Sequence, residues 1–289
     1  MRLELRHVRK SFGKRQALAG VDLTIASGAR VALLGPNGSG KTTLTRAIMG
    51  LVEHEGEILV DGKPLRTGPE LAARLAYVPQ VTPQIGATVD EIVRIVTGLR
   101  GVSRGVVVEL AAELGLELDR VRHQPVRGLS GGMRQKLFIA LALAAPAELL
   151  VLDEPTASLD AAARARVLAR VGAIRNVTLV LCSHRLDELR ALVDHVVALD
   201  DGKVAYDGPA AVYLAARQEA VIELRHRGDA ADWLAANGFA RGTGDWWTRA
   251  VSHAEKLELL PAALARIGGA LDDVVIRETD RVDLEARHA

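Results

Sequence analysis

The chain has 289 residues, of which 49% are hydrophobic and 25% charged, a composition typical of globular rather than disordered proteins. A formal net charge of +1 offers no basic surface, so we expect no nucleic-acid partner. The single cysteine, Cys182, excludes disulfide scaffolds and thiolate metal clusters within the chain. The N-terminus lacks the apolar core of a signal peptide, and the longest apolar run, residues 137–147, is too short to span a bilayer. We therefore expect a cytoplasmic protein.

Strand-like and helix-like segments alternate along the first two thirds of the chain. Apolar runs predict strands at residues 30–35, 55–62, 74–80, 148–155 and 176–184, and helical patterns lie at 42–49, 133–143 and 161–173. Between Val89 and Leu118 the spacing is helical without a strand, which predicts an inserted helical subdomain at about 85–140. A turn at Asp200, Asp201 and Gly202 predicts a hairpin. The order favours an α/β fold with a mainly parallel sheet and an antiparallel β portion.

The last 70 or so residues follow a different pattern, which predicts a second domain. Segments 219–226, 229–238, 245–251, 254–268 and 271–278 alternate as β-α-β-α-β. We expect a first domain at 1–216 and a small C-terminal α+β domain at 217–289. Trp246 and Trp247 are adjacent on a predicted strand and so face opposite sides. Either one is core and the other a contact surface, or both are shielded by helices.

A glycine-rich segment between a predicted strand and a predicted helix matches the pattern G-x-x-x-x-G-K-[ST]. Its residues are Gly35, Pro36, Asn37, Gly38, Ser39, Gly40, Lys41 and Thr42, followed by Thr43. Glycines at these positions let successive backbone N–H groups converge on phosphate oxygens at a helix N-terminus. Lys41 is expected to bridge the β- and γ-phosphates of a nucleotide, and Thr42 to bind Mg²⁺. The alternative is a glycine-rich turn without a ligand.

A second motif is the pair of acids at the end of an apolar strand, residues 149–155. A strand buried on both faces ends in acids only where something offsets their desolvation. Asp153 is placed to hold Mg²⁺ as the acidic partner of a P-loop. Glu154 is a candidate general base for an attacking water. The alternative is an ordinary acid before a helix.

Three further side chains are candidates, two of them, His184 and Gln80, at the ends of predicted strands. His184 is either structural or positioned to contact a γ-phosphate. Gln80 by itself carries little information. Phe12 is either a core residue or a ring that stacks on a purine.

The segment Ser130, Gly131 and Gly132 opens a strongly helical stretch and resembles a second anion site. The alternative is an N-cap serine without a ligand. Because the P-loop already accounts for the triphosphate, a second cradle is redundant within one chain. It becomes useful if it contacts the γ-phosphate held by another copy.

Taken together, the order and spacing of these motifs over roughly residues 3–214 resemble the ATP-binding cassette (ABC) transporter family. The resemblance implies that Phe12 stacks on adenine and that Gln80 senses Mg²⁺ and a membrane partner. It implies that His184 is the switch histidine and that Ser158, Leu159 and Asp160 form the loop linking two sites, the D-loop. The signature segment comprises Leu129, Ser130, Gly131, Gly132 and Met133, and its Ser130 and Gly132 would contact ATP across a head-to-tail dimer.

The resemblance also implies the partners and the activity. We expect an ATPase that uses ATP and Mg²⁺, as a homodimer or a heterodimer with a paralogue. It would drive a separate integral-membrane permease from the cytoplasmic face of the membrane. Met133 replaces the usual glutamine, as in the type-two exporter branch, so we expect an exporter. The C-terminal segment resembles an accessory domain of such exporters. The alternatives are a soluble ABC ATPase in complex assembly, a transporter ATPase of the nitrous-oxide-reductase maturation type, and a nucleotide-binding regulator.

Overall fold

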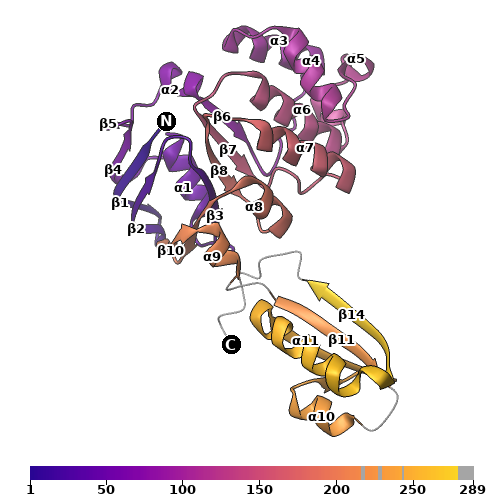
Figure 1. Ribbon diagram of the computed structural model, residues 1–289. Helices are drawn as coiled ribbons and strands as arrows, with labels where there is room; N and C mark the ends of the chain where they lie inside the picture. Colours follow the sequence, from indigo (N-terminus) through magenta and orange to yellow (C-terminus); the bar gives the residue numbers. More distant parts are fainter. Residues whose placement is uncertain (216–218, 227–229, 243, 279–289) are drawn as a thin grey trace. The chain divides into compact units, whose positions relative to one another are not determined.

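The chain divides into two compact units, Met1–His184 with Glu188–Ala210 and Arg185–Asp187 with Ala211–Ala289. The computed structural model describes residues 1–215, 219–226, 230–242 and 244–278 (Figure 1). Each unit has a hydrophobic core of its own. The predicted boundary between residues 216 and 217 falls outside the described residues and stays a prediction. No helix of the described ranges is both long and apolar enough to cross a membrane.

Unit 1 is built around a six-stranded sheet in which only the edge strand β10 runs antiparallel to its neighbour. In sheet order the strands are β10 (Lys203–Pro209), β9 (His195–Asp200), β3 (Arg30–Leu34), β8 (Thr178–Cys182), β7 (Leu149–Asp153) and β6 (Leu75–Val78). Every residue of β7 and β8 is buried, as expected for parallel strands covered on both faces. The predicted hairpin between β9 and β10 turns through Asp201 and Gly202, at φ values of 42° and 74°. The predicted α/β fold is confirmed.

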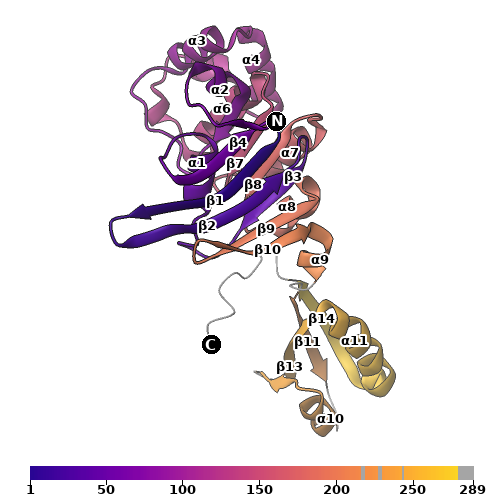
Figure 2. The same ribbon diagram turned by 90° about the vertical axis from the view of Figure 1, so that its left-hand side faces the viewer.

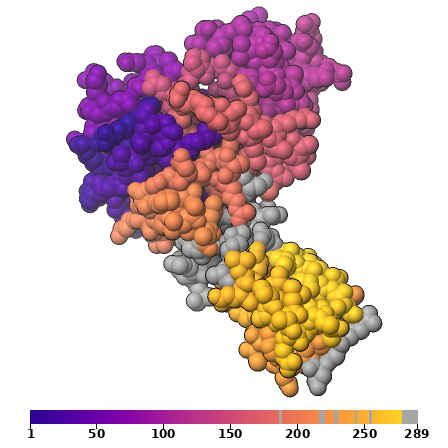
Figure 3. Space-filling model, in the orientation of Figure 1, coloured from indigo at the N-terminus to yellow at the C-terminus, as the bar shows by residue number. Residues whose placement is uncertain are grey.

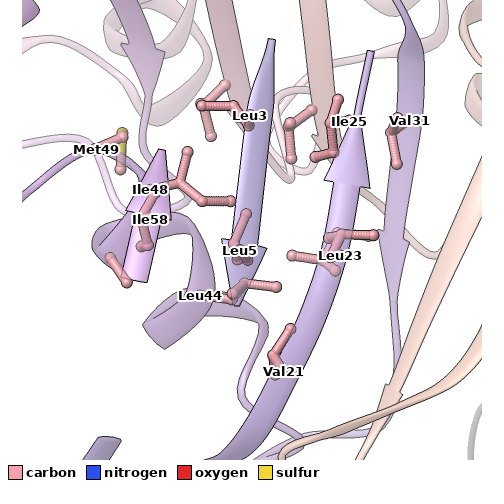
Figure 4. Packing of buried hydrophobic residues seen from close by; sticks show 14 of the residues in the cluster. Leu3, Leu5, Val21, Leu23, Ile25, Val31, Leu44, Ile48, Met49 and Ile58 are labelled. Carbon is pink, nitrogen blue, oxygen red and sulfur yellow. The ribbon is translucent and has the colours of Figure 1, made fainter. Parts of the chain in front are cut away.

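A second, antiparallel sheet supplies the other wall of the main core. Its order is β2 (Arg15–Ile25), β1 (Leu3–Phe12), β4 (Glu55–Val60) and β5 (Lys63–Pro64). Helix α1 (Lys41–Ile48) packs into the same core (Figure 4), where Leu44 and Ile48 meet side chains of both β1 and β2. In Figure 2 the β1–β2 hairpin extends beyond the neighbouring strands. The packing of α1 fixes the start of the helix, where the P-loop ends.

The predicted helical segment is present as a set of helices without a strand among them. These are α3 (Val89–Arg100), α4 (Arg104–Glu113), α5 (Leu118–Val121), the 3-10 turn Val126–Gly128 and α6 (Gly131–Ala144), with α2 (Pro69–Arg74) preceding them. Thr88 and Glu91 form a capping box at the start of α3, and Gly101 ends the helix at a φ of 64°. Figure 3 shows this segment as a continuous magenta surface.

Two helices that flank the sheet are anchored by one arginine of the central strand. Arg30 of β3 donates to the carbonyl of Leu192 at 2.6 Å and to that of Val171 at 3.1 Å. These carbonyls belong to the C-terminal turns of α8 (Leu186–Leu192) and α7 (Ala161–Ala173). A cation is favourable at both positions because helix C-termini carry unpaired carbonyls. Arg30 therefore fixes the C-terminal ends of α7, which begins after residue 160, and of α8, which begins after His184.

Unit 2 has a four-stranded antiparallel sheet in the order β12 (Ala240–Arg241), β13 (Trp246–Ser252), β11 (Glu219–His226) and β14 (Leu271–Glu278). Its helices are α9 (Ala210–Ala215), α10 (Ala231–Ala236) and α11 (His253–Ile267), followed by the 3-10 turn Gly268–Ala270. The two adjacent tryptophans differ in environment, as their opposite directions predict. Trp247 packs against the core of unit 2, whereas Trp246 stacks with Arg225 at 5.6 Å from the guanidinium carbon to the ring centroid.

Candidate active site

Four segments singled out in the sequence follow strands that end at the same edge of the parallel sheet. β3 leads into Gly35, β6 leads to Gln80, β7 ends in Asp153, and β8 is followed by His184. The parallel registers pair Val78 with Leu152 and Asp153 with Cys182, so these strand ends lie level with one another. The carboxyl edge of an open α/β sheet is where ligands bind in such folds.

The P-loop has a backbone path that only glycine can follow at two positions. Gly35 and Gly40 have φ values of 142° and 107°. A Cβ on Gly35 would lie 2.2 Å from the carbonyl oxygen of Leu199, and one on Gly40 would lie 2.4 Å from that of Ala17. The loop therefore folds tightly against two strands, and α1 begins at Lys41 with its N-terminal N–H groups at the loop.

Lys41 and Ser39 give the loop the features of an anion site. Lys41 Nζ donates to the carbonyls of Gly35 at 2.6 Å and Pro36 at 2.9 Å, and burial lowers the pKa of its ammonium. The Ser39 hydroxyl is buried and has no hydrogen-bond partner among the described residues. A bound triphosphate fits these observations, since it would accept from Ser39 and bring negative charge to Lys41.

Asp153 is a buried carboxyl beside a second acid. Burial, reinforced by the charge of Glu154, raises the pKa of Asp153, while the charge of Lys41 opposes the rise. A dication next to this carboxylate would offset both causes. Thr42 at the start of α1 and Gln80 after β6 are exposed and add the oxygen donors that Mg²⁺ prefers. The residues present therefore fit a magnesium ion.

Glu154 and His184 form a pair at the same edge. His184 Nδ1 lies 2.8 Å from Glu154 Oε1, and because a carboxylate can only accept, the imidazole donates. Glu154 has a φ of 46°, a left-handed backbone that non-glycine residues adopt rarely and that is common at active sites. Its N–H donates to the carbonyl of Cys182 at 2.8 Å, which ties the turn to β8. His184 thus contacts the candidate base itself.

The signature segment and the D-loop lie against each other. Ser130 is the N-cap of α6, and its hydroxyl accepts from Met133 N–H at 3.2 Å. A Cβ on Gly132 would lie 3.1 Å from the carbonyl oxygen of Ser158, so this glycine allows the close approach. Asp160 caps α7 by accepting from Ala163 N–H at 2.7 Å, and this bond lowers the pKa of its carboxyl. Both helix starts are capped by side-chain hydrogen bonds.

Phe12 is not a core residue: it is 54% exposed near the tip of the β1–β2 hairpin. Its cross-strand partner is Arg15, whose guanidinium donates to the carbonyl of Gly38 in the P-loop at 3.3 Å. Arg15 therefore links the hairpin that bears Phe12 to the phosphate cradle, and Lys10 Nζ lies 5.2 Å from the centroid of the Phe12 ring. Arg15 was not predicted as a site residue, because it belongs to none of the motifs and lies 23 residues before Gly38 in the sequence.

Comparisons with known proteins agree with this geometry. A family model described as ABC transporter matches residues 18–157. The chain is 39% identical to an aliphatic sulfonates import ATP-binding protein of Nocardia farcinica, over 69% of this chain and 78% of that protein. It is 34% identical to a Nod factor export ATP-binding protein of Cupriavidus metallidurans, over 71% of this chain and 70% of that protein.

Two solved structures share the fold. One is a bacterial Atm1-family ABC exporter with ATP bound, with a TM-score of 0.67, 29% identity and coverage of 74% of this chain but only 40% of that one. The other is a dimeric bacterial ABC transporter cassette, with a TM-score of 0.65, 27% identity and coverage of 72% and 98%. The chain therefore belongs to the ABC transporter family and is the kind of subunit that binds and hydrolyses ATP in that family.

Proposed function

We propose that two copies of the cassette, identical or paralogous, close head to tail around two ATP molecules and drive a separate integral-membrane permease. The observation that carries the proposal is the Glu154–His184 pair at the sheet edge that also holds the P-loop. Within one chain, the signature segment lies against the D-loop, where Gly132 approaches Ser158. We infer that the nucleotide contacted by the signature segment is the one bound to the P-loop of a second copy. The similarity to a dimeric cassette supports this arrangement.

Within each site, different residues of one chain bind the nucleotide, bind Mg²⁺ and catalyse hydrolysis. Lys41 and the backbone N–H groups of the P-loop, residues 35–43 apart from Pro36, hold the β- and γ-phosphates, and Phe12 stacks on adenine. Thr42, Asp153 and Gln80 hold Mg²⁺, which when bound neutralises charge on the phosphate oxygens. Glu154 accepts a proton from the attacking water, and His184 orients its carboxylate. Positioning and fixed charges supply most of the rate enhancement.

The second chain completes the site. Ser130 and Gly132, between Leu129 and Met133, contact the γ-phosphate at the start of α6, where the helix dipole favours negative charge. Asp160 links the two sites through the D-loop.

The proposed direction of transport is export. Met133 in the signature and the similarity to a Nod factor export protein support it, whereas the similarity to a sulfonate import protein supports uptake. Transport by the reconstituted complex into inside-out vesicles would establish the direction, since an exporter accumulates its substrate there and an importer does not.

An exposed apolar face on the helical segment is a candidate for the permease contact. In α3, Val89 and Val93 are buried, whereas Ile95 and Leu99 are 53% and 80% exposed. Ile95 and Leu99 are four residues apart and so share one face of the helix. Exposed apolar surface of this kind marks interaction sites when it is contiguous.

Replacing Ile95 and Leu99 together by glutamate is expected to lower the amount of co-purifying membrane protein about 10-fold, because the change places two charges in the proposed apolar contact and the residues at the centre of an interface cost about 2 kcal/mol or more when removed. The measurement is affinity purification from detergent-solubilised membranes, with ATP affinity measured on the same preparation. Leu51→Glu is the control, since Leu51 is 66% exposed, between the values for Ile95 and Leu99, and lies outside the helical segment. Unchanged recovery in the double variant would exclude this face. Absence of any membrane protein with the wild type would contradict the transport proposal.

A further inference from the structure

The turn that carries Glu154 is held by two buried polar side chains from other helices. Gln135 of α6 donates from Nε2 to the carbonyl of Pro155 at 2.9 Å. Thr156 donates from its hydroxyl to Oε1 of Glu188 on α8. Gln135 is 3% exposed and Glu188 1% exposed. We call Gln135, Thr156 and Glu188 the polar clamp.

Polar groups buried to this degree are costly unless they are hydrogen-bonded, so their placement requires a reason. Gln135 bonds to the backbone of the segment in which Glu154 adopts its left-handed conformation, and Thr156 belongs to that segment. Such a conformation persists only where the surroundings over-determine it. The polar clamp adds constraints on this turn to the bond from Glu154 N–H to the carbonyl of Cys182.

The contacts also join the segments that bear both members of the Glu154–His184 pair. Thr156 lies two residues after Glu154, and Glu188 lies four residues after His184. Two side-chain bonds, Glu154 to His184 and Thr156 to Glu188, therefore connect the same two segments. Gln135 adds a third connection from α6, the helix whose first turn is the signature.

We propose that Gln135, Thr156 and Glu188 are positioning residues that hold the Glu154 carboxylate in the orientation required for proton transfer. The proposal rests on the role of Glu154 as the base. It assigns no contact with ATP to the polar clamp. Loss of the clamp therefore lowers kcat and leaves ATP binding unchanged, since a displacement of about 1 Å can cost roughly 100-fold in rate.

The test compares Thr156→Val, which keeps the shape and removes the hydroxyl, with Thr156→Ser, which keeps the hydroxyl. Thr156→Val is expected to lower kcat about 10- to 100-fold with the ATP Kd within twofold of wild type. Thr156→Ser should restore most of the rate. Because Thr156→Val removes a partner from a buried carboxylate, the double variant Thr156→Val with Glu188→Met, which removes both polar partners, is the version expected to retain stability. Gln135→Met tests the third contact independently and should show the same selective loss of kcat.

A double-mutant cycle with Glu154→Gln separates positioning from a purely structural role. If the polar clamp acts through Glu154, Thr156→Val should lower kcat no further in the Glu154→Gln background. An equal fold-loss of kcat from Thr156→Val in the wild-type and Glu154→Gln backgrounds would overturn the proposal. So would a fall in melting temperature and ATP affinity in the clamp variants whose kcat stays at the wild-type value. If Glu154→Gln itself hydrolyses ATP at the wild-type rate, the base assignment fails. If Glu154→Gln hydrolyses ATP slowly and Thr156→Val hydrolyses it at the wild-type rate, the role of Glu154 stands and only the proposal for the polar clamp fails.

Discussion

Replacing Glu154 by glutamine is expected to slow ATP hydrolysis about 100- to 1000-fold and to trap ATP in a stable dimer. The amide keeps the size of the side chain and can still contact His184, but it cannot accept the proton of the attacking water. Binding is preserved because Lys41 and the P-loop backbone are untouched. The nucleotide therefore stays between the two copies for longer than in the wild type.

Single-turnover hydrolysis and size-exclusion chromatography with ATP measure the two parts of this prediction. Glu148→Gln is the matched control: it is an exposed acid just before the same strand, paired with Arg74. An exposed ion pair contributes little, so the control should hydrolyse ATP at the wild-type rate. Hydrolysis by Glu154→Gln at the rate of the control would show that Glu154 is not the base.

Much of the fold could be predicted because the elements carry strong local patterns. The apolar runs of β7 and β8 and the helical spacing of α7 and α11 identify these elements without tertiary information. Two-residue strands such as β5 and β12 were not predicted, because they exist only through pairing with β4 and β13. Their residues have no periodicity of their own to detect.

The site divides in the same way. The P-loop, Asp153 and Glu154 follow from residue type and spacing, because phosphate cradles and Mg²⁺ ligands require them at those intervals. The parallel registers place the strands that precede these residues level with one another at one sheet edge. The roles of individual residues remain proposals.

The features that were missed depend on contacts between distant residues. Thr156 and Glu188 are 32 residues apart, and Gln135 and Pro155 are 20 apart. The left-handed backbone of Glu154 has no sequence signal either, since the residue is not glycine. Of the two alternatives for Phe12, its exposure excludes the core, and stacking on adenine stays a prediction.

Ser130→Arg is expected to abolish dimer closure and to lower ATP hydrolysis at least 100-fold, while each chain still binds ATP. A composite site places the start of α6 against the γ-phosphate held by the other copy. A long arginine side chain there fills the space that Ser130 and the adjacent glycines leave for that phosphate. Loss of one phosphate-contacting donor alone commonly costs 100- to 1000-fold in rate.

Two further variants separate the effect of the added bulk and charge in Ser130→Arg from the effect of losing the Ser130 hydroxyl. Ser130→Ala removes the hydroxyl that accepts from Met133 N–H, which costs about 0.5–2 kcal/mol of helix stability, and with it the proposed γ-phosphate contact, but it adds no bulk or charge at that position. Ser103→Arg puts the same bulk and charge at the N-cap of α4, which the proposal keeps clear of ATP. We expect ATP Kd values within a fewfold of wild type for all three variants and closed dimers for Ser103→Arg. If Ser130→Arg dimerises and hydrolyses ATP as Ser103→Arg does, the signature does not complete a neighbour's site. If it loses ATP binding as a monomer, the signature acts within its own chain.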